Sequence, residues 1–133
     1  NASFKKNGID IELDIKTDAT IEGFPNEYSQ VLLNLLNNAK DVLTERNVKN
    51  PKVTIQLFME SDKALMVIRD NGGGIPEDIM DKIFEPYFST KPDDRGTGIG
   101  LYMSKMIIEN KGNGKLTAKN TEDGAEFTIE MQA

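Results

Sequence analysis

The sequence contains no cysteine, no histidine and no tryptophan. Without cysteine the chain has no disulfide, no thiol nucleophile and no zinc–thiolate site. Without histidine it has no imidazole base, which excludes a Ser-His-Asp triad. Apolar runs are short as well: none approaches the roughly 20 residues that a membrane helix needs, and the first residues lack the apolar core of a signal peptide. We therefore expect a domain without membrane contact, whose chemistry depends on other side chains.

Positive charge is also scarce. Sixteen basic and twenty-two acidic side chains give a formal net charge of −6. A nucleic-acid groove needs clustered positive charge, so we expect no nucleic-acid partner. The 133 residues, 38% of them hydrophobic, are enough for one domain with its own core. We treat residues 1–133 as a single domain, with Asn1 and Ala2 as a candidate cloning remnant because the chain does not begin with methionine.

Hydrophobic periodicity predicts the secondary structure. Alternation of apolar and polar residues indicates strands, and apolar positions at steps of three and four indicate helices. The predicted strands are 9–15, 20–22, 52–59, 64–68, 115–119 and 125–131. The predicted helices are 26–46, 76–84 and 99–110. The order of elements predicts an α/β sandwich in which helices cover one face of a mixed sheet.

The first predicted helix carries an unusual polar ridge beside its apolar stripe. Its members recur three and four residues apart and are Gln30, Asn34, Asn37, Asn38 and Asp41. Asparagine is a mediocre helix former, so three in one helix suggest a functional site. Asn34 and Asn38 share one helix face, and their amide oxygens suit Mg²⁺, although two amides that hydrogen-bond in a helix groove would explain the pattern equally well.

A second motif, Asp70–Ile75, follows a predicted strand directly. Its three consecutive glycines allow positive φ angles and a close approach of the backbone to a ligand. An aspartate at a strand end can accept a hydrogen bond from an exocyclic amine such as that of adenine. A simple turn in which Asp70 bonds its own backbone remains the alternative.

Two further motifs lie between the predicted second and third helices. Phe84–Lys91 contains aromatic residues that can anchor a loop, and Lys91 and Arg95 are cations within reach of phosphate oxygens. Gly96–Leu101 opens a helix, where free N–H groups and the positive end of the helix dipole favour phosphate. Its spacing is neither that of a Walker loop nor that of a dinucleotide fingerprint. We expect residues 85–97 to form a lid that becomes ordered when nucleotide binds.

Together and in this order, the four motifs resemble the ATP-binding catalytic domain of sensor histidine kinases. That family belongs to a superfamily that includes gyrase, the ninety-kilodalton heat-shock chaperone and the MutL repair proteins. The resemblance covers essentially the whole chain, from about residue 9 to 131. Its matches are Asn34–Ala39 to the N box, Asp70–Gly74 to the first glycine box, Phe84–Lys91 to the F box and Gly96–Leu101 to the second glycine box. The resemblance implies a Bergerat-type two-layer α/β sandwich, with a mixed and mostly antiparallel sheet covered on one face by about three helices.

The resemblance also implies roles for individual residues. Asn38 would bind Mg²⁺ and Asn34 would assist at the metal or the phosphates, which makes both of them candidate catalytic residues. Asp70 would accept from the adenine amine, and Gly124 falls near the family's last glycine position. The residues implied to bind ATP are Asp70, Gly72, Gly74, Ile75, Lys91, Gly96, Gly98, Gly100, Leu101 and Thr128.

The function implied is that of a histidine kinase catalytic domain in a two-component system, with ATP and Mg²⁺ as cofactors. The γ-phosphate would pass to a histidine on a separate dimerisation domain, so the chain alone is not expected to autophosphorylate. A hydrolytic ATPase of the superfamily is the less favoured alternative, because those relatives place a glutamate where Asn34 stands. A stand-alone serine kinase acting as an anti-sigma factor and a nucleotide-sensing module also remain open.

The implied partners are the dimerisation domain, which carries the phosphoacceptor histidine and is absent from this chain, and a downstream response regulator. The isolated domain is expected to be a monomer. We expect it to be cytoplasmic, within a full-length protein that is often membrane-anchored in this family.

Overall fold

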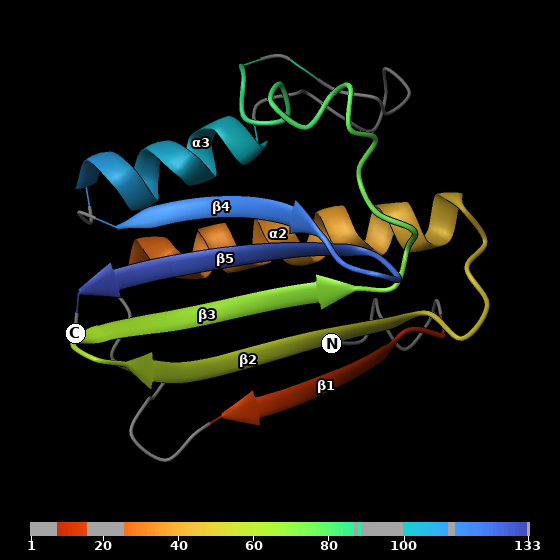
Figure 1. Cartoon of the computed structure of the whole chain (residues 1–133), viewed down its shortest axis with the longest axis horizontal. Coiled ribbons are helices and arrows are strands. Elements are labelled where there is room, and N and C mark those ends of the chain that lie inside the picture. Colours follow the sequence, from red (N-terminus) through yellow and green to blue (C-terminus); the bar gives the residue numbers. More distant parts are fainter. Residues whose placement is uncertain (1–7, 16–25, 87, 89–99, 112–113, 133) are drawn as a thin grey trace.

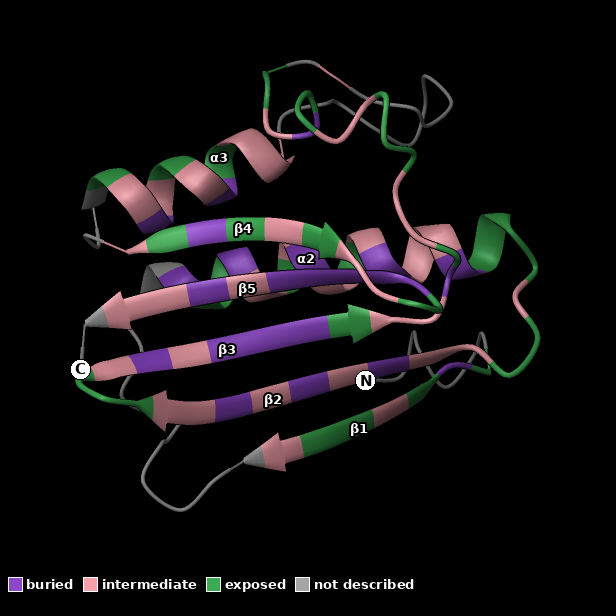
Figure 2. Cartoon of the chain, viewed as in Figure 1, coloured by how far each residue is buried: buried purple, intermediate pink, exposed green. Residues whose placement is uncertain are grey.

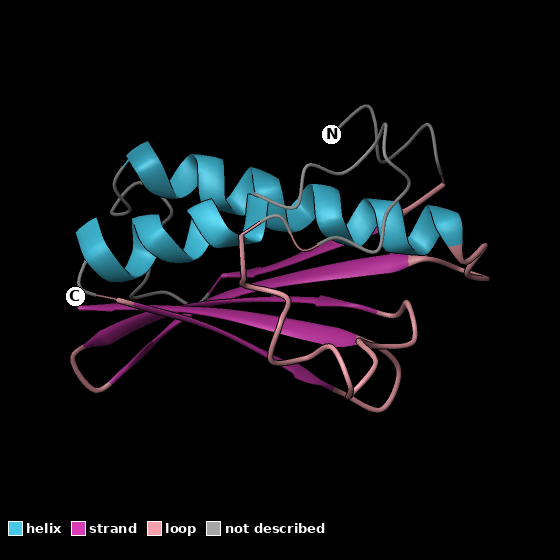
Figure 3. Ribbon diagram, turned by 90° about the horizontal axis from the view of Figure 1, so that it is seen from above, coloured by secondary structure: helices cyan, strands magenta, loops and turns pink. Residues whose placement is uncertain are grey.

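The computed structural model describes residues 8–15, 26–86, 88, 100–111 and 114–132. Within this part of the chain, a five-stranded sheet forms one layer and the helices form the other (Figures 1 and 3). The predicted α/β sandwich is therefore confirmed. The predicted extended piece at 20–22 lies outside the described residues.

The sheet has its strands in the order β1-β2-β3-β5-β4. Their bounds are β1 (Asp10–Ile15), β2 (Lys52–Glu60), β3 (Lys63–Asp70), β4 (Lys115–Asn120) and β5 (Ala125–Gln132). β1 runs parallel to β2, and the other neighbouring pairs are antiparallel. The mixed, mostly antiparallel sheet is confirmed, and within it β2–β3 and β4–β5 pair as antiparallel neighbours in sequence.

The described helices lie on one face of the sheet (Figure 3). α2 (Asn26–Glu45) follows the predicted periodicity closely and buries Val31 and Leu35 almost completely. α3 (Gly100–Met106) continues as a π-helical segment, η2 (Ile107–Lys111). Among the residues that the structure describes, no helix is long and apolar enough to cross a membrane.

The core lies between the helices and the sheet. Because strand side chains alternate between faces, one set of register partners points toward the helices. Ile55, Ile68 and Phe127 are such partners across β2, β3 and β5, and all of them belong to the core. Figure 2 shows the longest runs of buried residues in β3 and β5, which are neighbours in the sheet.

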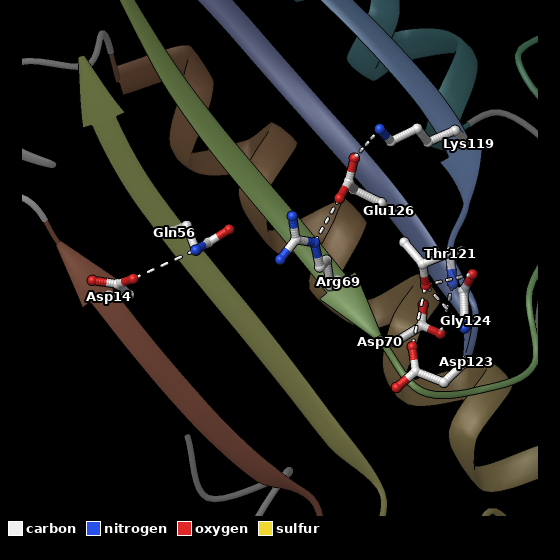
Figure 4. A network of polar contacts seen from close by, with 10 residues as sticks. Asp14, Gln56, Arg69, Asp70, Lys119, Thr121, Asp123, Gly124 and Glu126 are labelled. Atoms are coloured by element: carbon white, nitrogen blue, oxygen red, sulfur yellow. Dashed lines mark hydrogen bonds and ion pairs between the residues drawn. The ribbon is translucent and has the colours of Figure 1, made fainter. Parts of the chain in front are cut away.

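The opposite face of the sheet carries charge. Arg69 and Lys119 flank Glu126, with N–O distances of 2.5 Å and 3.3 Å (Figure 4). Burial alone would raise the pKa of Glu126, but the hydrogen bonds and positive charges of Arg69 and Lys119 outweigh it and lower that pKa below its ordinary value.

Two expectations about local structure are wrong. Residues 76–84 form successive turns rather than a short helix: Ile79 N–H donates to the Pro76 carbonyl and Lys82 N–H to the Ile79 carbonyl, each three residues back. Helices this short are marginal on their own, and here the turns already bury Ile83 in the core. The described helical layer therefore holds α2 and α3 with its extension, rather than three separate helices.

The apolar face predicted for β1 is only partly buried. Ile9, just before the strand, is buried, whereas Leu13 is 63% exposed. β1 is the edge strand and has only β2 beside it, so a strict alternation of residue types does not guarantee a covered face here.

Candidate nucleotide site

The segment that follows β3, here called the glycine turn (Asp70–Ile75), centres on a partly buried carboxylate. Asp70 Oδ1 accepts hydrogen bonds from the N–H groups of Gly72, at 2.9 Å, and of Ala125, at 3.4 Å. Asp70 Oδ2 accepts no hydrogen bond from any residue that the structure describes. Burial raises the pKa of Asp70, and the two backbone hydrogen bonds and the charge of Arg46 only partly oppose this effect. One oxygen is thus fixed by the backbone and the other remains as an acceptor.

Close backbone packing fixes the position of Asp70. A Cβ built on the buried Gly124 would collide with the carbonyl oxygen of Asp70, so only glycine fits beside it. Figure 4 shows Thr121, Asp123 and Gly124 gathered next to Asp70, at the point where β4 turns into β5. Gly124 was placed near the family's last glycine by resemblance alone, and the structure adds the steric reason.

Three N–H groups of the glycine turn already donate to protein acceptors. The N–H of Gly72 donates to Asp70, that of Gly73 to the Asp123 carbonyl at 2.9 Å, and that of Ile75 to Asn120 Oδ1 at 2.7 Å. A phosphate-binding loop needs free N–H groups that point at the ligand. The geometry therefore favours a role in binding a base rather than phosphate.

The two later glycines of the turn are explained by local geometry. Gly73 and Gly74 have φ angles of 95° and 90°, a region that side chains with a Cβ rarely adopt. A Cβ on Gly74 would also come within 2.8 Å of Asn120 Oδ1. The resemblance implies that Gly74 belongs to the nucleotide site, and the structure adds that the Asn120 side chain fills the space beside it.

Two side chains that the sequence analysis missed hold the carbonyl groups of the turn. Arg46 Nη1, just beyond α2, donates to the carbonyls of Gly72 at 2.6 Å and Gly74 at 2.9 Å. Asn120 Nδ2, at the end of β4, donates to the Ile75 carbonyl at 2.8 Å. Neither residue belongs to a motif, and their proximity to the turn depends on contacts 26 and 45 residues apart in sequence.

The polar ridge of α2, called the asparagine ridge from here on, contacts α3 through Asn34. Asn34 Oδ1 accepts from Gln30 Nε2 at 3.1 Å, and Asn34 Nδ2 donates to Ser104 Oγ at 3.1 Å. Ser104 is fully buried, so this bond satisfies a hydroxyl in the interface between the helices. Asn38 lies one turn further along on the same side of α2 and is partly exposed.

A magnesium ion would find amides rather than carboxylates here. Among the described residues there is no group of three or more carboxylates, histidines or cysteines that could hold a metal. Mg²⁺ is usually bound by one or two protein oxygens together with phosphates and waters, so an amide such as that of Asn38 fits the ion only in company with a nucleotide. Asn34 fits less well because both ends of its amide are already in use.

The phosphate side of the predicted site is described only in part. Lys91, Gly96 and Gly98 lie outside the described residues, as does most of the expected lid. Gly100 begins α3, and Leu101 packs against the core. Before the lid, Phe84 packs edge-on against Phe127 with ring centroids 6.3 Å apart, while the Lys105 ammonium lies 4.7 Å from the Phe84 ring centroid.

Thr128 is the one described candidate that the structure separates from the rest. It pairs with Val67 and Thr117, and it alternates with Phe127 and Ile129, which both point into the core. Thr128 therefore points to the open face of the sheet, whereas Asp70 and Gly72 lie toward α2 at the strand end. We omit Thr128 from the site.

Comparison with known proteins agrees with this geometry. Residues 23–133 match the family described as histidine kinase-, DNA gyrase B- and HSP90-like ATPase. The two-component sensor PprA of Pseudomonas aeruginosa is 34% identical over 96% of this chain, which corresponds to 14% of PprA. The chain thus spans about a seventh of that relative's length.

Solved structures give the same result. The catalytic domain of the histidine kinase ThkA has a TM-score of 0.79 and 31% identity, over 98% of this chain and 83% of that one. A longer ThkA chain, solved in complex with the response regulator protein TrrA, has a TM-score of 0.76 and 26% identity, over 98% of this chain and 36% of that one. The chain belongs to the histidine kinase-, gyrase B- and HSP90-like ATPase family, as an ATP-binding catalytic domain of the sensor histidine kinase type.

Proposed function

We propose that this domain binds Mg²⁺-ATP and supplies the γ-phosphate to a histidine on a dimerisation domain of a longer sensor kinase. The observation that carries the proposal is the Asp70 carboxylate, which the backbone holds by one oxygen and leaves with the other as an acceptor. An adenine amine is a donor that matches this acceptor, and inosine and guanine present a carbonyl at the same position. The site therefore selects adenine by its hydrogen-bond pattern.

The metal would sit between the α2 face and the phosphates. Asn38 is the proposed protein ligand, and the nucleotide and water would complete the coordination of the ion. When bound, Mg²⁺ neutralises charge on the β- and γ-phosphates. Asn38 would hold the ion in place from its position on α2. Asn34 would help to fix the spacing of α2 and α3 through its hydrogen bond to Ser104.

The proposed reaction is transfer to a partner rather than hydrolysis. The residue one helical turn before Asn38 is Asn34, whose amide cannot accept a proton from water at neutral pH. The chain contains no histidine, so the acceptor imidazole must come from outside these 133 residues. The 133 residues would thus supply the nucleotide-binding half of the enzyme.

The partners follow from this division of roles. We propose the dimerisation domain as the direct phosphate acceptor and a response regulator as the next one. The ThkA relative has been solved with a response regulator, which supports a partner of that kind here. We also propose that the domain acts in the cytoplasm, as a monomeric unit when separated from the dimerisation domain.

Two experiments, one on nucleotide binding and one on phosphate transfer, test the two parts of this proposal separately. The chain is first titrated with ADP and with GDP in the presence of MgCl₂; we expect binding of ADP and much weaker binding of GDP. Radiolabelled ATP is then added with the dimerisation domain of the same longer protein in trans, and label is expected on its histidine. Binding without transfer would contradict the kinase assignment, and no preference for ADP would contradict the adenine site.

A further inference from the structure

The glycine turn is held from two sides by side chains that belong to no motif. Arg46 approaches from the end of α2 and Asn120 from the end of β4. The two residues are 74 positions apart in sequence, and each of them makes two hydrogen bonds to the backbone of the turn (120 − 46 = 74).

Arg46 holds two carbonyls with one nitrogen. Its Nη1 lies 2.6 Å from the Gly72 oxygen and 2.9 Å from the Gly74 oxygen, on either side of Gly73. A Cβ on Gly73 would come within 3.2 Å of the same nitrogen. Hydrogen bonds from a charged donor are stronger than neutral ones, so Arg46 favours the conformation in which both carbonyls converge.

Asn120 binds both backbone polar groups of Ile75 with its side-chain amide, as a neighbouring strand would with its backbone. Its Oδ1 accepts from the Ile75 N–H at 2.7 Å, and its Nδ2 donates to the Ile75 carbonyl at 2.8 Å and to Glu77 Oε1 at 3.1 Å. Both polar groups of Ile75 are therefore satisfied by one side chain. These hydrogen bonds fix the position of Ile75, the last residue of the glycine turn.

The conformation held in this way is one that the chain does not favour by itself. Gly73 and Gly74 both have positive φ angles, and an unrestrained run of three glycines has many alternatives. Asp70 is at the start of the same turn, and its Oδ1 is bonded to Gly72. If the turn relaxes, the acceptor oxygen of Asp70 loses its fixed direction.

We propose that Arg46 and Asn120 are positioning residues of the nucleotide site, which clamp the glycine turn from the ends of α2 and β4 and so orient Asp70 for an adenine amine. This proposal rests on the proposed function, because it assigns these residues to the adenine half of that site. Neither side chain needs to touch the nucleotide. The clamp restricts the glycine turn to few conformations before the base binds, so less conformational entropy is lost on binding.

The test is a comparison of ADP and IDP, which differ at the position of the adenine amine. Titration calorimetry on the 133-residue chain with MgCl₂ gives both dissociation constants for the unaltered protein, Arg46→Ala and Asn120→Ala. In each variant we expect ADP to bind at least about fivefold more weakly, with IDP changing less, so that the ADP preference shrinks. Thermal unfolding of each variant is recorded in parallel.

Matched controls separate positioning from general destabilisation. Arg69→Ala removes an arginine whose side chain pairs with Glu126 on the open face of the sheet, and Asn110→Ala removes an exposed asparagine on η2. Arg69→Ala is expected to lower the unfolding temperature without changing the ADP-to-IDP ratio. If Arg46→Ala or Asn120→Ala does not fold, Arg46→Lys and Asn120→Ser take their places, with a smaller loss of ADP preference expected.

A pH profile gives an independent result for Arg46. Its positive charge lowers the pKa of Asp70, whereas the neighbouring Asp123 raises it. Arg46→Ala should therefore move the acid limb of ADP binding to higher pH, and Arg46→Lys should largely restore it.

The outcomes distinguish the two proposals. If the unaltered chain prefers ADP but the Arg46 and Asn120 variants keep the same preference and the same acid limb, the clamp is wrong and the proposed function survives. If the unaltered chain shows no preference for ADP over IDP, the adenine site itself is wrong and the clamp is overturned with it. A reduced ADP preference in both variants, and not in either control, supports the clamp.

Discussion

The glycine turn and the asparagine ridge of α2 are the two described parts of the candidate site, and they are built in opposite ways. The turn has backbone groups bound on both sides by Arg46, Asn120 and Asp123, and it leaves one carboxylate oxygen as an acceptor. The ridge presents side-chain amides on α2, which is anchored to the core by its apolar residues. The glycine turn thus depends on a fixed backbone conformation, whereas the asparagine ridge depends on polar side chains at the surface of α2.

The two regions should therefore respond differently to substitution. The turn depends on close backbone packing, so its failures should affect folding and base recognition together. The ridge depends on amides at the surface of α2, so its failures should affect the metal or the contact between helices.

Gly124→Ala is expected to have the largest effect. The new Cβ would collide with the backbone of Asp70, which cannot shift without moving β3. We expect the free energy of unfolding to fall by about 3 kcal/mol or more, with loss of ADP binding. Urea denaturation followed by circular dichroism measures the first effect. Stability close to that of the unaltered chain would contradict the close contact between the two strand ends.

Asp70→Asn should separate binding from stability. The amide oxygen can still accept from Gly72 and Ala125, but the other position becomes a donor, so ADP should bind roughly 10- to 100-fold more weakly. Stability should stay the same or rise, because an ionised carboxylate no longer has to be buried. Calorimetry and thermal unfolding on the same samples check both results, and a large loss of stability would contradict this account.

The pH dependence of the free energy of unfolding shows whether burial of the Asp70 carboxylate stabilises or destabilises the fold. Burial raises the pKa of Asp70 above its unfolded value of about 3.8, so the folded state holds this proton more tightly than the unfolded state does. The stability that this group contributes is therefore present below about pH 3.8 and is lost as the pH rises through the raised pKa. Asp70→Asn should remove this component from the pH profile of unfolding, and an identical profile would show that Asp70 does not carry it.

Asn38→Ala should act on the metal and not on the base. We expect the increase in ATP affinity caused by MgCl₂ to shrink by about tenfold or less, since one neutral ligand among several is lost. Affinity measured in EDTA should not change. Equal enhancement by MgCl₂ in the variant and the unaltered chain would exclude Asn38 as a ligand.

Asn34→Ala tests the structural side of the ridge. Removing the amide leaves the fully buried Ser104 hydroxyl without this partner, which should cost about 1–2 kcal/mol of unfolding free energy. Asn34→Ala with Ser104→Ala should recover part of the loss, because both partners are then apolar. Additive losses in the double variant would contradict the Asn34–Ser104 contact.

Glu126→Gln should have the smallest effect. Glu126 is almost buried between Arg69 and Lys119, but both cations are well exposed, so the expected loss is about 1 kcal/mol or less. The pKa of Glu126 is lowered, so its contribution is present above its unfolded pKa of about 4.5 and is lost as the pH falls through the lower folded value. Binding of ADP should be unchanged, since these charges lie on the open face of the sheet.

Much of the fold could be predicted from the sequence because its signals are periodic. The alternation that predicted the strand at 52–59, the apolar run that predicted the strand at 64–68 and the three- and four-residue steps that predicted the helix at 26–46 each lie within one element. The structure has these three elements within one or two residues at each end. The wrong helix at 76–84 shows the limit, because local spacing fits a helix while packing of Ile83 is already satisfied by turns.

The site was predictable only where a local motif carries it. Asp70 and its glycines form one run, so their proximity needed no tertiary information. Arg46 and Asn120 reach the turn only through the assembled helix and hairpin. Thr128 was assigned by the resemblance alone, and its alternation with the core residues Phe127 and Ile129 places it on the face of the sheet away from Asp70.

The most direct test of the adenine assignment is a cycle of two proteins and two nucleotides. Dissociation constants for ADP and IDP are measured by calorimetry on the unaltered chain and on Asp70→Asn, with MgCl₂ present throughout. The carboxylate accepts from the adenine amine, whereas the amide of the variant can donate to the inosine carbonyl. The account predicts that the unaltered chain prefers ADP and that the variant loses or reverses this preference. The same ADP-to-IDP ratio in both proteins would show that Asp70 does not read the base.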